Sequence, residues 1–90
     1  MSLTNLELIV GEALETSDES HRKRLSAILD PSNIYDPELK EIVNCLKNPK
    51  FNFQLILVLY GERTLAYAME LANQYQKKNI KKQEQEQDND

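Results

Sequence analysis

Residues 51–69, FNFQLILVLYGERTLAYAM, form the most apolar stretch of the chain, and their periodicity decides the fold. As a helix, the stretch places a seam of side chains at alternating steps of four and three residues. This seam comprises Phe53, Leu57, Tyr60, Thr64, Tyr67 and Leu71. A second stripe beside it comprises Leu55, Val58, Leu65, Met69 and Ala72. Gly61 is either tolerated within one helix that runs to about residue 78, or it splits the segment into 52–60 and 62–78. Because both stripes keep phase across the glycine, the pattern favours a single helix with a possible bend at Gly61.

Two other interpretations of this stretch are disfavoured. As a strand it has a fair two-residue period, but no other segment offers a strand for it to pair with. As a membrane span it is too short, because the uninterrupted apolar run covers only 55–60 and two charged residues follow. A spanning helix needs roughly 20 apolar residues. The sequence therefore predicts a helix and no contact with a membrane.

Shorter helices are predicted upstream from their capping residues. Thr4 and Glu7 fit a capping box, in which each side chain bonds the other residue's backbone, and a first helix follows at 5–15. Gly11 lies inside that helix and weakens it, which suggests a close contact with another helix. The same box pattern recurs at 16–19 and predicts the start of a second helix.

The third helix has the clearest signal in the chain. Asp36 is placed to cap its N-terminus and Pro37 to occupy its first position. An apolar stripe follows at helical spacing, and Asn48-Pro49 ends it. The fold class expected is therefore all-α: a single domain over 1–78, built as a small bundle of about four helices with a longer apolar C-terminal helix. Residues 79–90 are polar and are predicted to form a disordered tail.

Composition narrows the classes of function. The formal net charge is −4 and the sequence pI is near 5.0, which disfavours general binding to nucleic acid. A single cysteine excludes an intrachain disulfide and fits a reducing compartment. The N-terminal residues lack the basic n-region and the small-residue cleavage site of a signal peptide, so a cytoplasmic location is expected.

No catalytic or metal-binding pattern is present in the sequence. His21 and Cys45 are the only residues that suggest metal or thiol chemistry, and a metal site needs three or four ligands. Cys45 lies beside an apolar stripe and is expected to be a small, partly buried residue. With only two glycines there is no phosphate-cradling loop. We therefore expect no enzymatic activity, no cofactor, no metal and no small-molecule substrate.

A protein-binding site is predicted around the charged pair in the apolar helix. Glu62 and Arg63 either emerge on the one exposed side of the helix or line a contact with another protein, where arginine is an enriched residue type. Tyr60 and Tyr67 flank the pair in the seam. The predicted function is a non-enzymatic protein-interaction module, such as an adaptor, an assembly factor or an inhibitor or antidote-type regulator. Its partner would be a protein, including a second copy of itself.

The alternative function uses a basic cluster on the second helix, residues 21–24. The cluster comprises His21, Arg22, Lys23 and Arg24. It either forms a solvated helix face, paired with Asp18 and Glu19, or contacts phosphate in a nucleic-acid-associated regulator. Four consecutive residues point to all sides of a helix, which favours the solvated face.

Overall fold

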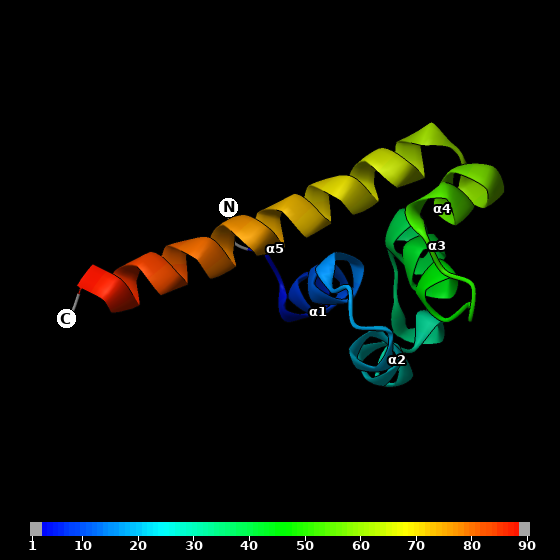
Figure 1. Ribbon diagram of the computed structural model, residues 1–90. Coiled ribbons are helices and arrows are strands. Elements are labelled where there is room, and N and C mark those ends of the chain that lie inside the picture. Colours follow the sequence, from blue (N-terminus) through cyan, green and yellow to red (C-terminus); the bar gives the residue numbers. More distant parts are fainter. Residues whose placement is uncertain (1–2, 89–90) are drawn as a thin grey trace.

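The computed structural model describes the backbone of residues 3–88 and the side chains of residues 3–78, and the described part is all-helical. The elements are α1 (Asn5–Glu15), α2 (Glu19–Ala27), the 3₁₀ turn η1 (Pro31–Asn33), α3 (Pro37–Leu46), α4 (Phe53–Tyr60) and α5 (Glu62–Asp88). Figure 1 shows α5 as a long rod, with the shorter helices gathered beneath one half of it. This arrangement confirms the predicted all-α bundle with a longer C-terminal helix.

The helix starts follow from the capping residues in two cases and differ from the prediction in one. The capping box of Thr4 and Glu7 is formed in both directions, and the Asp36 carboxylate accepts from the Glu38 N–H. The predicted box at 16–19 is wrong. Asp18 caps α2 instead, accepting from two N–H groups, because its short carboxylate stands directly before the first helical residue.

The predicted continuous helix across Gly61 is also wrong. Gly61 has φ 101° and ψ 179°, a conformation that is essentially restricted to glycine, and it separates α4 from α5. Its N–H still closes the last turn of α4 by donating to the Leu57 carbonyl. The turn lets α4 fold back onto α3 and α5, which buries Ile56 completely. A straight helix would carry α4 away from the core and leave Ile56 in solvent, so it would lose the stabilisation that comes from burying this side chain.

Gly61→Ala is expected to destabilise the protein by about 1–3 kcal/mol, because a Cβ strains the backbone at this φ. No neighbouring atom lies within 4 Å of the Cβ position, so the effect comes from the backbone alone. Urea unfolding of the variant measures it. An unchanged or raised midpoint would show that the chain runs through Gly61 as one helix.

The core lies between α5 and the helices beneath it. Its members are Val10, Ala13, Leu14, Leu29, Ile34, Leu39, Ile42, Val43, Cys45, Leu46, Ile56, Ala68, Leu71 and Ala72. Helices α1, α3 and α4 all pack on α5, whereas α2 packs on α1 and α3. Helices α1 and α5 approach closely at Gly11, where an added Cβ would lie 2.9 Å from both the Leu71 carbonyl oxygen and the Tyr75 Cβ. The glycine in α1 therefore marks the close helix contact that the sequence suggested.

The predicted disordered tail, 79–90, lies outside the residues whose side chains are described. The backbone of α5 is described as far as Asp88.

Candidate functional site

Helix α4 leaves large apolar side chains in solvent. Val58, Leu59 and Tyr60 have exposed fractions of 70%, 54% and 37%. The reason is compositional: the helix sequence FQLILVLY is apolar around most of its circumference, and only the side that carries Ile56 is fully buried. We call these three exposed residues the α4 face.

The turn at Gly61 places a pair of opposite charges directly after the α4 face. Glu62 and Arg63 are both exposed. The Arg63 side chain is 89% exposed, and its Nε lies 3.9 Å from the Glu38 carboxylate of α3. An ion pair this open to water contributes only about 0–1 kcal/mol, so the guanidinium can exchange Glu38 for another carboxylate at little cost.

Tyr67 is separated from the other three predicted partner-binding residues by its burial. It packs against the core from α5. Burial, together with the negative charges of Asp36 and Glu7, raises the pKa of Tyr67 to about 12. Tyr60, Glu62 and Arg63 thus lie exposed around the turn at Gly61, whereas Tyr67 is half-buried against the core.

The raised pKa predicts a loss of stability at high pH. The folded protein keeps the phenol proton of Tyr67 up to a pKa of about 12, whereas the unfolded chain loses it near 10.0. The contribution of the protonated Tyr67 phenol to the free energy of unfolding is therefore fully present below pH 10 and is lost as the pH rises towards 12. Ultraviolet absorbance titration should show a late phenol ionisation that Tyr67→Phe lacks. Identical titration curves at high pH for the two proteins would contradict the assignment.

The basic cluster, residues 21–24, is divided between internal and external contacts. His21 forms a hydrogen bond to the Glu12 carboxylate of α1. Arg22 donates to the carbonyl oxygens of Ala13, at 3.3 Å, and Thr16, at 2.9 Å. Two of the four residues thus connect α2 to α1. Their side chains are engaged within the protein, so their presence in the cluster requires no phosphate ligand.

The other two members of the cluster are exposed. Lys23 lies 4.0 Å from Glu19, one turn earlier, which is a pairing expected from the sequence. Arg24 lies in the last turn of α2, where its positive charge interacts favourably with the negative end of the helix dipole. Lys23 and Arg24 offer only a small positive surface, and this is less than a nucleic-acid backbone normally requires.

Cys45 is buried in the core from α3, more completely than the sequence suggested. Burial raises the pKa of its thiol, and the charge of Glu41 acts in the same direction. A reactive cysteine needs the opposite shift, because the thiolate is the nucleophile. Among the side chains that the structure describes, no three or more His, Cys, Asp or Glu residues are arranged to hold a metal ion.

The outward direction of Val58 and Leu59 does not follow from the apolar spacing, which places Val58 in a stripe of one long helix and gives Leu59 no helical role. The available signal was the length of the apolar run at 55–60, which exceeds what one side of a helix can bury. Lys47 and Phe51 lie in the segment between α3 and α4, where helical spacing does not indicate which way a side chain points.

Comparison of the chain with family models, with curated proteins and with solved structures finds no match in any of the three. Over the described residues, no helix combines the length and apolar composition needed to cross a bilayer.

Proposed function

We propose that this chain is a non-enzymatic protein-interaction module that binds a partner protein through the α4 face and the adjoining Glu62 and Arg63. The observation that carries the proposal is the exposure of three consecutive large apolar side chains on one short helix. Single exposed apolar residues are common on protein surfaces, whereas several large ones on one short helix, followed directly by two charges, are typical of a binding site. Tyrosine and arginine are also the residue types that contribute most at interfaces. An adaptor, an assembly factor and an inhibitor would each use such a surface.

A second copy of this chain is the partner that the charges favour. Glu62 and Arg63 are adjacent, exposed and opposite in sign. A two-fold axis through the α4 face would place Glu62 of one copy near Arg63 of the other, and the reverse, so the surface is complementary to itself. Dimerisation would also add to the modest stability that a core of this size supports.

The double variant Val58→Lys/Leu59→Lys tests the surface. The wild-type protein is expected to be dimeric by multi-angle light scattering, and the double variant monomeric at the same concentration with its fold intact by circular dichroism. Ile28→Lys is the matched control, because Ile28 is an equally exposed apolar residue at 67% but lies at the end of α2. Dissociation by Ile28→Lys to the same extent would show that the α4 face is not the binding surface.

Charge exchange tests the identity of the partner. Glu62→Lys alone and Arg63→Glu alone should each weaken the dimer, because like charges then meet across the axis. Mixing the two variants should restore association. A wild-type protein that is monomeric at every concentration would exclude the second copy. In that case the proposal still requires a foreign partner whose capture is lost with Val58→Lys/Leu59→Lys and retained with Ile28→Lys; equal capture by all three proteins would overturn it.

A further inference from the structure

A cavity of about 400 Å³ lies between α2 and the segment that joins α3 to α4. Its lining combines apolar residues from the α3–α4 side with charged residues, mostly from α2, and comprises Glu19, Arg22, Lys23, Ser26, Ala27, Leu46, Lys47, Asn48, Pro49 and Phe51. Cavities that hold small ligands measure roughly 300–1,000 Å³ and are mainly apolar with a few placed polar groups. This cavity has both properties, and it is separate from the α4 face.

The charge of the cavity is opposite to that of the chain. Three cations, Arg22, Lys23 and Lys47, face a single carboxylate, Glu19, in a protein whose net charge is −4. Glu19 is a loose partner, because its oxygen is 4.0 Å from the Lys23 ammonium and both side chains are largely exposed. An incoming carboxylate would displace it with little loss.

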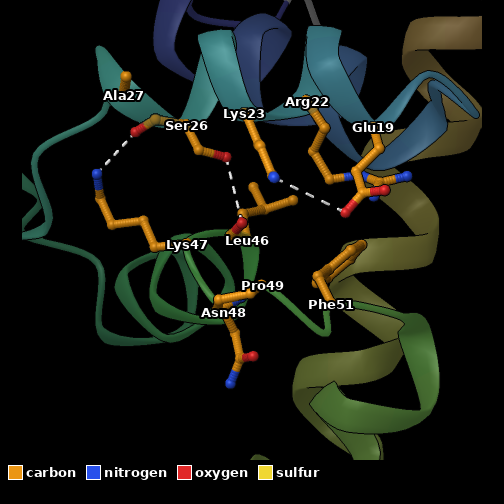
Figure 2. Close-up of a pocket in the computed structure, with 10 residues that line it drawn as sticks. All are labelled: Glu19, Arg22, Lys23, Ser26, Ala27, Leu46, Lys47, Asn48, Pro49 and Phe51. Carbon is orange, nitrogen blue, oxygen red and sulfur yellow. Dashed lines mark hydrogen bonds and ion pairs between the residues drawn. The ribbon is translucent and has the colours of Figure 1, made fainter.

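The guanidinium of Arg22 is fixed in place before any ligand arrives. Its bonds to the two α1 carbonyls leave other N–H groups unused, since a guanidinium carries five. Its Cζ also lies 5.2 Å from the centroid of the Phe51 ring. Figure 2 shows Arg22 above Phe51 and Lys23 reaching down towards Leu46, so positive charge stands over an apolar floor. A pre-positioned side chain loses little entropy on binding.

The carbonyl groups at the helix ends nearby do not repel an anion. The Ser26 carbonyl of α2 accepts from the Lys47 ammonium at 2.7 Å, and the Leu46 carbonyl of α3 accepts from the Ser26 hydroxyl at 3.3 Å. Both bonds are drawn in Figure 2. The negative ends of two helices are thus partly neutralised where they meet the cavity.

We infer that this cavity binds a small amphipathic carboxylate, with its aliphatic or aromatic body on Leu46, Pro49 and Phe51 and its carboxylate at Lys23 and Arg22. The volume of about 400 Å³ lies within the range of small-molecule sites, which favours a free small molecule over a peptide segment. This inference is independent of the proposed partner surface on α4.

Hexanoate is the probe, and amide chemical shifts measured by NMR are the readout. Saturable shifts confined to residues around the cavity are expected with hexanoate. Hexylamine has the same apolar body and the opposite charge, and acetate has the charge without the body, so both should produce far smaller shifts. Equal shifts with hexylamine, or shifts that do not saturate, would overturn the inference. Binding of an acidic peptide with a capped C-terminus, but not of hexanoate, would overturn it as well.

Two variants and one control locate the site. Lys23→Glu removes the more accessible cation and should weaken hexanoate binding by about tenfold or more. Ala27→Trp fills the hollow from an exposed position without changing charge and should abolish binding. Lys40→Glu makes the same charge change on α3, outside the cavity lining, and should leave the affinity unchanged. Equal weakening by Lys23→Glu and Lys40→Glu would reduce the effect to net charge and reject the site.

Discussion

Gly11→Leu is expected to destabilise the protein by about 3 kcal/mol or more, which is a large part of the stability of a domain this small. The first atom of the new side chain already lies 2.9 Å from the Leu71 carbonyl oxygen and from the Tyr75 Cβ. Neither atom is the end of a flexible side chain, so α1 and α5 would have to separate. This pair of helices makes the most extensive contact in the described fold. Urea unfolding monitored by circular dichroism measures the loss.

Gly11→Ala separates the local effect from the tertiary one. Helix propensity alone predicts stabilisation by roughly 1 kcal/mol, because alanine replaces glycine inside a helix. The contact with α5 predicts destabilisation, and we expect the contact to decide the sign. Glu15→Leu, at an exposed position of the same helix, is the control and should change stability little. A gain in stability from Gly11→Ala would show that the two helices are further apart than described.

Ile56→Ala is expected to destabilise the protein by about 3 kcal/mol, within the range of 2–5 kcal/mol found for such truncations in cores. Ile56 is the only fully buried side chain of α4, with an exposed fraction of 0%. It therefore holds the helix that Gly61 folds back onto the bundle. Hydrogen exchange should also become faster in α4 than in α1, because the anchor of the shorter helix has been removed.

Gln54→Ala is the matched control for Ile56→Ala. Gln54 lies two residues earlier on α4, is exposed and is not part of the α4 face, so its truncation should change stability by no more than about 0.5 kcal/mol. Similar losses from the two variants would mean that α4 does not present Ile56 to the core. They would also remove the basis for the α4 face as an exposed surface.

The helices and most of their starts are predictable from sequence because the signals are local. Thr4 reaches Glu7, and Asp36 reaches the first turn of α3, through contacts between residues at most three apart. The box predicted at 16–19 is not formed, and Asp18 caps α2 instead. Both residues match a capping pattern, and only the path of the chain after α1 decides which of them precedes the first helical turn.

The sequence predicts which types of residue form the candidate site, but only partly which individual residues are exposed there. Glu62 and Arg63 are charged residues in an apolar segment, and the sequence alone indicates that they must reach solvent or a partner. Tyr67 has the same residue type as Tyr60 and lies in the same seam, yet it is half-buried against the core. Tyr60 and Tyr67 differ in exposure because the other helices cover this part of α5 more fully than they cover the outer side of α4. That coverage depends on contacts between segments far apart in the chain.

Composition and spacing are enough to predict that most of residues 51–69 are helical, that the segment is too short to span a membrane, and that it carries more apolar surface than one helix side can bury. These properties depend on composition and on spacing within a few residues. The tertiary structure alone decided that Gly61 divides the segment, because unbroken phase permits a straight helix and a folded pair equally. The folded pair prevails since it buries Ile56, and the same reversal directs Val58, Leu59 and Tyr60 outward. The apolar excess that the sequence contains thereby becomes the surface at which we propose that this protein meets its partner.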